Sequence, residues 1–111
     1  MNFGLDYDGV CTGPGLTIWA SWAKFVRDHG HKVYLVTMRY PSECHDILEL
    51  LTQNLEGVYP TSRMAKKPHM DSLGIKIDVW IDDHPEAIHK NAVEIWAVPT
   101  PEGDPVVPSY D

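Results

Sequence analysis

The chain has 111 residues, of which 43% are hydrophobic, and its formal net charge is −7. This length and composition predict one globular domain rather than a disordered segment or two domains. The negative charge argues against non-specific nucleic-acid binding through a basic face, although a divalent cation can offset repulsion of a phosphate locally. The apolar runs are too short to cross a membrane, and the start of the chain lacks the pattern of a signal peptide.

The two cysteines, Cys11 and Cys44, have no zinc-ligand spacing and are too few for a disulfide framework. They indicate a reducing compartment. We therefore expect a cytoplasmic protein with no membrane partner.

Apolar periodicity and turn residues predict five strands separated by four helices. The expected strands are the run that ends at Asp6 and Asp8, followed by 32–38, 58–61, 77–81 and 93–98. The expected helices are 16–29, a second that begins at Pro41 with Ser42 as its N-cap and stops near Glu56, and two short ones at 68–73 and 85–92. Pro60 marks the third strand as a sheet edge or a strand end.

This alternation of strands and helices predicts an α/β protein with a Rossmann-like, three-layer fold. A central, mostly parallel sheet of five strands would have helices on both faces. Residues 99–111 contain four prolines and show little periodicity, so we expect an irregular tail there.

Polar residues follow four of the expected strands. They are Asp6 and Asp8, then Thr37 and Arg39, then Lys66 or Lys67, and finally Asp82 and Asp83. In open parallel sheets the site lies outside the carboxyl ends of the strands, so we expect these side chains to converge. Residues i and i+2 of a strand point the same way, which applies to the first acid pair, and Gly9 allows a sharp turn directly after it.

These residue types suit phosphate chemistry. Carboxylate oxygens, water and a substrate phosphate are the ligands that magnesium (Mg2+) prefers. One carboxylate could attack phosphorus, while a second carboxyl protonates the leaving oxygen and later activates water. A hydroxyl and an ammonium group would stabilise charge that develops on the phosphoryl oxygens. No serine–histidine–acid or cysteine–histidine arrangement has comparable support in the sequence.

The same residues have structural interpretations. Asp82 and Asp83 precede Pro85, where acids favour the start of a helix. Thr37 is a β-branched residue of the kind that strands favour. One of the two lysines is expected to be a surface residue, and Arg39 either contacts a substrate phosphate or lies exposed.

Four segments of the chain resemble the four motifs of the haloacid dehalogenase superfamily, in the same order. They are Asp6–Val10, Leu35–Thr37, Lys66–Pro68 and Trp80–Asp83. The resemblance spans residues 1–98, which would form the catalytic domain, with 99–111 as the tail. Aspartate at the second acid position, Asp8, resembles the phosphatases and phosphotransferases of the superfamily. The resemblance therefore implies magnesium-dependent hydrolysis of phosphate monoesters through a phospho-aspartate.

The resemblance also implies a role for each acid. Asp6 would be the nucleophile and a metal ligand. Asp8 would be the general acid and base, and its backbone carbonyl would bind Mg2+. Asp82 and Asp83 would bind Mg2+ directly or through water.

The remaining site residues would hold the substrate. Thr37 would hydrogen-bond the phosphoryl group, and Gly9 and Arg39 complete the expected substrate-binding set. A lysine would steady the nucleophile and the phosphate. Lys66 and Lys67 both fit that motif, and Lys67 is favoured because Lys-Pro at a helix start recurs in relatives.

Many relatives carry an inserted cap domain after the first or the third strand. The connections here are short, at 9–15 and 58–67, so the resemblance predicts a capless member with an open site unless another subunit covers it. Its partner would be a phosphorylated small molecule or a phosphorylated polymer end. Two alternatives stay open: a phosphatase that processes nucleotides or nucleic-acid ends, and a non-catalytic protein that keeps the fold and the metal site.

Overall fold

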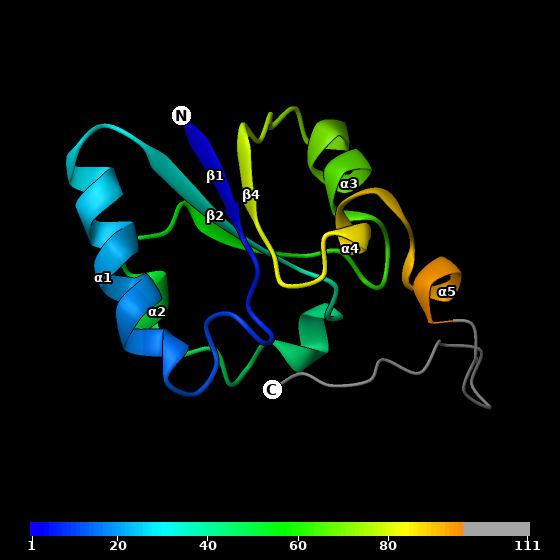
Figure 1. Ribbon diagram of the computed structural model, residues 1–111, viewed down its shortest axis with the longest axis horizontal. Helices are drawn as coiled ribbons and strands as arrows, with labels where there is room; N and C mark the ends of the chain where they lie inside the picture. The colour runs from blue at the N-terminus through cyan, green and yellow to red at the C-terminus, as the bar shows by residue number, and fades with distance from the viewer. Residues whose placement is uncertain (97–111) are drawn as a thin grey trace.

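The computed structural model describes residues 1–96, and Figure 1 shows a sheet with helices around it. The expected tail at 99–111 and the last two residues of the expected fifth strand lie outside the described residues. The strands are β1 (Asn2–Leu5), β2 (Lys32–Thr37), β3 (Gly57–Pro60) and β4 (Val79–Ile81). The helices are α1 (Gly15–Asp28), α2 (Glu49–Thr52), α3 (Lys66–Ser72), α4 (Glu86–His89) and α5 (Ala92–Ile95), with a 3₁₀ turn, η1, at Pro41–Glu43.

The sheet is parallel throughout, in the order β3-β2-β1-β4. Leu5 of β1 is level with Leu35 of β2 and with Ile81 of β4. The α/β class and the parallel sheet are therefore confirmed, with four strands within residues 1–96. Pro60 ends β3, an edge strand, as expected from its missing N–H group.

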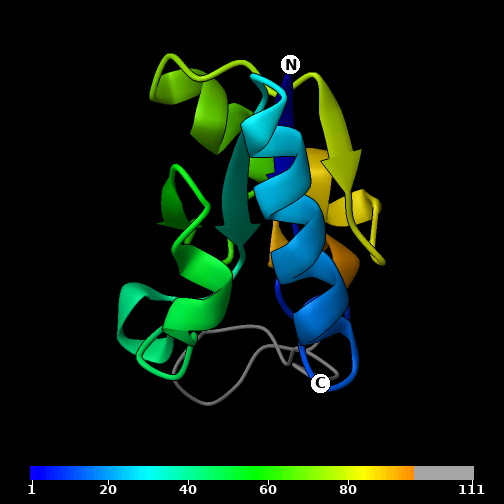
Figure 2. The ribbon, with the colours of Figure 1, turned by 90° about the vertical axis from the view of Figure 1, so that its left-hand side faces the viewer.

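Helices cover both faces of the sheet, and the buried residues of β2 point alternately into two separate cores. Val33 and Leu35 pack with Ala23 of α1 and with α2 on one face. Tyr34 and Val36 pack with Met70 of α3 on the other. Figures 1 and 2 show the same division, with α1 and α2 on one side of the sheet and α3 and α4 on the opposite side.

The predicted second helix is not continuous. Its start forms only η1, and Cys44 and Leu48 have non-helical backbone angles before α2 begins. The capping residue is Tyr40 rather than Ser42, because the Tyr40 N–H donates to Glu43 Oε1 at 2.8 Å. The irregular residues 44–48 matter for the site, because Asp46 lies among them.

The predicted fifth strand is wrong over residues 93–95, which form α5 instead. The Asn91 N–H donates to Glu94 Oε2 at 2.6 Å, and this capping box starts a helix. Ala92 is completely buried, and its N–H donates to the carbonyl of Arg63 at 2.8 Å. The local cap and this tertiary contact outweigh the strand preference of Val93 and Ile95.

The connections from β1 to α1 and from β3 to α3 are short. Residues 6–14 join β1 to α1, residues 61–65 join β3 to α3, and both lie within the described residues without an inserted domain. None of the helices in residues 1–96 has the length and apolar character needed to cross a bilayer.

Candidate active site

The site begins at Asp6, directly after β1. The Asp6 N–H donates to the carbonyl of Ile81 at 2.9 Å, which extends the pairing with β4 by one step. Because Leu5 and Ile81 are level, Asp6 and Asp82 leave neighbouring strands at the same height. Asp6 is buried, with 7% of its surface exposed.

Lys66, the first residue of α3, joins these two acids. Its Nζ donates to Asp6 Oδ1 at 2.8 Å and to Asp82 Oδ2 at 2.6 Å, and the residue is only 2% exposed. Lys67 instead pairs with Asp71 at the surface, at 2.7 Å. The preference for Lys67 is therefore corrected: consecutive helical side chains point about 100° apart, so only one of the two can face the sheet edge.

Asp83 completes a group of three carboxylates with Asp6 and Asp82, and oxygens of all three lie within 4.8 Å of one another. Three carboxylates and the ammonium group of Lys66 sum to a charge of −2 (three times −1, plus 1). A divalent cation would balance this charge, and an all-oxygen donor set suits Mg2+. The residues therefore fit the metal that the superfamily resemblance implies.

The electrostatics of this group also favour a cation. Burial raises the pKa of Asp6 to about 8, Lys66 opposes the rise, and the charge of Asp82 adds to it. Burial by itself would lower the pKa of Lys66, but the charges of Asp6 and Asp82 outweigh burial and raise it. Repulsion and desolvation of the carboxylates thus exceed what a single ammonium group offsets.

Gly9 lets the chain pass close to this group. Its φ of +81° is in the left-handed region, and a Cβ atom there would collide with Asp83 Oδ2. The Gly9 N–H donates to Thr12 Oγ1 at 3.2 Å, within the β1–α1 connection. Gly9 is therefore required for the turn, and its role in substrate binding stays a prediction.

Asp8 does not share the partners of Asp6. It is held by Arg39, whose Nη2 donates to Asp8 Oδ1 at 2.7 Å and whose Nε donates to Asp8 Oδ2 at 3.0 Å. The two acids therefore have separate cations, whereas the strand alternation predicted that they point the same way. Burial raises the pKa of Asp8, and the hydrogen bonds and charge of Arg39 oppose this.

Arg39 is only 7% exposed, so of the two alternatives for this residue the exposed one is wrong, and contact with a substrate phosphate stays a prediction. Its Nη1 donates to Asp46 Oδ1 at 2.7 Å and to the carbonyl of Glu43 at 2.6 Å. Sequence reasoning missed Asp46, which fell inside the expected continuous helix. The sequence did not indicate that Asp46 pairs with Arg39, because an irregular segment between η1 and α2 brings the two residues together.

Thr37 ends β2 and is 1% exposed. Its Oγ1 accepts the N–H of Arg39 at 3.3 Å. Since Leu35 is level with Leu5, Thr37 lies two residues beyond that level, at the same edge of the sheet as Asp6 and Asp8. This is the position that the sequence predicted for a phosphate-binding hydroxyl.

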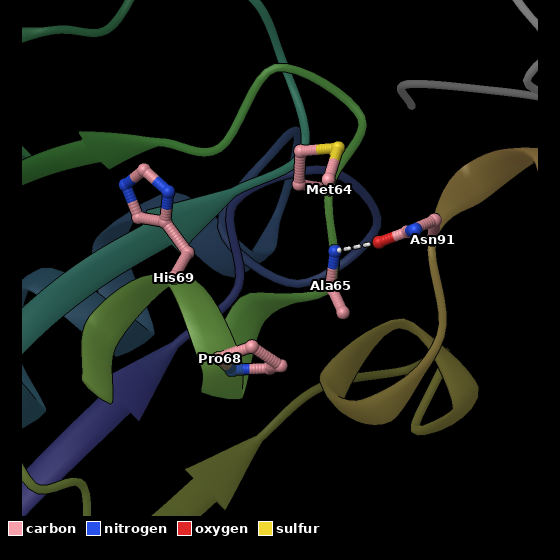
Figure 3. Close-up of a pocket in the computed structure, with 5 residues that line it drawn as sticks. All are labelled: Met64, Ala65, Pro68, His69 and Asn91. Atoms are coloured by element: carbon pink, nitrogen blue, oxygen red, sulfur yellow. Dashed lines mark hydrogen bonds between the residues drawn. The ribbon is translucent and has the colours of Figure 1, made fainter. Parts of the chain in front are cut away.

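A small cavity of about 210 Å³ lies beside the start of α3 (Figure 3). Its lining residues are Met64, Ala65, Pro68, His69 and Asn91. The Ala65 N–H donates to Asn91 Oδ1 at 2.8 Å, so the cavity wall joins the β3–α3 connection to the chain before α5. None of these residues is among the predicted site residues, although Pro68 belongs to the third quoted motif.

Comparison of the chain with protein-family models, with curated proteins and with solved structures finds no match. The functional assignment therefore depends on the residues at this sheet edge.

Proposed function

We propose that this protein is a magnesium-dependent phosphohydrolase that cleaves phosphate monoesters through a phospho-aspartate at Asp6. One observation carries the proposal: Lys66 joins Asp6 to Asp82 at the carboxyl edge of a parallel sheet, with Asp83 beside them. Membership of the haloacid dehalogenase superfamily belongs to the same proposal. The four-stranded sheet with helices on both faces supports a reduced, capless form of its three-layer fold.

In the first step a carboxylate oxygen of Asp6 forms a bond to phosphorus, and the bond from phosphorus to the ester oxygen breaks. The leaving oxygen takes a proton from Asp8. In the second step water attacks the phosphoryl group, gives a proton to Asp8, and releases Asp6 and inorganic phosphate. Lys66 holds Oδ1 of Asp6 throughout, which leaves Oδ2 to attack.

The charges of the site support this sequence of steps. Mg2+ held by Asp6, Asp82 and Asp83 would supply the positive charge that keeps the nucleophile ionised and offsets the substrate phosphate. Thr37 accepts a hydrogen bond from Arg39, so its own hydroxyl hydrogen can be donated to a phosphoryl oxygen.

The short connections around the site support a substrate whose phosphate is presented at an accessible end. Phosphorylated small molecules and phosphorylated polymer ends both fit this description. The net charge of −7 disfavours long nucleic acids, which a basic groove would have to hold. Rates with sugar phosphates, mononucleotides and 3′- or 5′-phosphorylated oligonucleotides would separate these substrates.

The test is hydrolysis of an aryl phosphate with and without Mg2+. We expect activity only with Mg2+, and a loss of at least about a thousandfold in Asp6→Asn, because the amide cannot attack phosphorus. Circular dichroism should show that the variant keeps its fold. Hydrolysis by Asp6→Asn at the wild-type rate would overturn the proposal.

A further inference from the structure

We propose that Arg39 is a positioning residue, which orients Asp8 for proton transfer to the leaving-group oxygen while Asp46 holds the guanidinium group in place. This inference rests on the proposed function. The sequence suggested instead that Arg39 contacts the phosphate of a substrate.

The contact between Arg39 and Asp8 has two points. Nη2 donates to Oδ1 at 2.7 Å and Nε donates to Oδ2 at 3.0 Å, so the guanidinium edge faces both carboxylate oxygens. Such a planar fork fixes the orientation of the carboxylate as well as its distance. The side chains are 8% and 13% exposed, so little water competes for the contact.

Arg39 is itself held by the chain. Its third nitrogen, Nη1, donates to Asp46 Oδ1 at 2.7 Å and to the carbonyl of Glu43 at 2.6 Å. The guanidinium carbon lies 4.9 Å from the centre of the Tyr7 ring, within reach of a cation–π interaction. All three guanidinium nitrogens therefore donate to acceptors of this chain, which suits a fixed support better than a group that captures phosphate.

This arrangement has a consequence for the proton. When Asp8 gives its proton to the leaving oxygen, it becomes a carboxylate, and Arg39 stabilises that charge where it forms. The same carboxylate then accepts the proton of the attacking water. No further reactant is needed, because the proton that leaves Asp8 in the first step is replaced in the second.

Leaving groups distinguish a positioning role from phosphate binding. An alkyl oxygen leaves poorly unless it is protonated, whereas p-nitrophenolate leaves without a proton. Loss of Arg39 should therefore slow hydrolysis of glycerol phosphate much more than hydrolysis of p-nitrophenyl phosphate. A residue that binds phosphate would affect both substrates alike, because both present the same phosphoryl group.

The experiment measures kcat and KM for both substrates, with saturating Mg2+, in wild type, Arg39→Met, Asp8→Asn and the double variant. In Arg39→Met we expect kcat to fall about a hundredfold for glycerol phosphate and less than tenfold for p-nitrophenyl phosphate, with KM changed by about twofold at most. The double variant should be no slower than Asp8→Asn with glycerol phosphate, since both changes act through the same proton. Arg27→Met, a surface arginine of α1, is the matched control and should leave kcat unchanged.

Two further variants guard against misfolding of Arg39→Met. Arg39→Lys keeps the charge but lacks the fork, and it should show the same dependence on the leaving group. Asp46→Asn touches neither Asp8 nor the substrate, and it should show a smaller effect of the same kind. An equal loss of kcat for both substrates, or a rise in KM with kcat unchanged, would overturn the positioning role alone. A wild-type protein without Mg2+-dependent hydrolysis of either substrate would overturn the proposed function as well.

Discussion

Two clusters of charged residues lie next to each other at the carboxyl edge of the sheet and differ in their chemistry. The lysine cluster consists of Asp6, Lys66, Asp82 and Asp83, and the arginine cluster consists of Asp8, Arg39 and Asp46. The first sums to −2 and the second to −1, and the outer acid of the second, Asp46, is 53% exposed. Solvent also reaches Asp83, the exposed acid of the lysine cluster. The clusters differ in their buried part: the lysine cluster places two nearly buried carboxylates, Asp6 and Asp82, around one ammonium group, whereas Arg39 faces a single such carboxylate, Asp8.

The difference follows from the two cations. Lysine carries a compact charge with three donors, so Lys66 can join carboxylates from two different strands. Arginine offers a rigid fork, so Arg39 holds one carboxylate in a fixed orientation. Asp6 and Asp8 lie two residues apart but differ as a result. Asp6 belongs to a cluster that still attracts a cation, whereas Arg39 largely balances the charge of Asp8.

The largest expected effect comes from removing the lysine. In Lys66→Met, Asp6 and Asp82 lose their common partner in a buried place, and the free energy of unfolding should fall by about 3 kcal/mol. The proposed phosphatase activity should be lost too. Urea unfolding and an activity assay would measure both.

Lys67→Met is the matched control, because Lys67 pairs with the half-exposed Asp71 at the surface. Stability and activity should change little. If Lys67→Met proved as damaging as Lys66→Met, the assignment of the lysine cluster would be wrong.

The next effect concerns pH and Mg2+. The pKa of Asp6 is raised to about 8 in the folded protein, from 3.8, so the folded state binds this proton more tightly than the unfolded chain does. The contribution of Asp6 to stability therefore falls as pH rises from about 4 to about 8. The pKa of Lys66 is raised above 10.5, so the contribution of Lys66 persists throughout this window.

Thermal unfolding in EDTA, compared between wild type and Asp6→Asn, isolates this effect. The wild type should lose stability relative to Asp6→Asn between pH 5 and pH 8. Mg2+ at pH 8 should raise the Tm of the wild type. At a Mg2+ concentration of a hundred times its Kd, the free energy of unfolding should rise by about 2.7 kcal/mol. An unchanged Tm with Mg2+ would contradict the assignment of the lysine cluster as the metal site.

A smaller effect is expected at Gly9. In Gly9→Ala, the new Cβ meets Asp83 Oδ2 and the residue must keep a φ of +81°, so Mg2+ affinity should fall. Gly13→Ala is the control, because Gly13 has a φ of +58° but no atom within 4 Å of its Cβ position. Both variants should lose about 1 kcal/mol of stability to backbone strain. Calorimetric titration with Mg2+ should separate them, and equal affinities would argue against Asp83 as a ligand.

The smallest effect is expected at the rim of the arginine cluster. Asp46 is half-exposed, so Asp46→Asn should lower the free energy of unfolding by less than about 1 kcal/mol. Its Mg2+ affinity should equal that of the wild type. A loss of stability similar to that of Lys66→Met would mean that the two clusters are not as different as their burial indicates.

The sequence predicted best where the apolar pattern was strong. Helix α1 and strand β2 agree with the predicted ranges to within one residue at each end. The convergence of Asp6 with Asp82 and Asp83 followed from the rule that parallel strands end at one edge.

Other features depended on contacts that no periodicity reveals. Lys66 and Lys67 could not be separated because α3 begins two residues earlier than predicted, and the start of the helix decides which side chain faces the acids. The contact of Asp46 with Arg39 depends on the irregular residues 44–48, for which the amphipathic pattern predicted a helix. At residues 93–95, β-branched side chains suggested a strand, but the Asn91–Glu94 cap decided the outcome locally.

Two hydrogen bonds between the β3–α3 connection and the start of α5 bear on when the site can form during synthesis. Ser62 and Arg63 both have positive φ, and two hydrogen bonds of 2.8 Å, from Ala65 to Asn91 and from Ala92 to Arg63, hold this turn just before Lys66. A ribosome synthesises Lys66 some 25 residues before it synthesises Asn91 and Ala92. A nascent chain that stops before Asn91 already contains every acid of the lysine cluster, but it lacks the brace for the turn that presents the lysine. We therefore expect the site to assemble only after Asn91 and Ala92 have been synthesised.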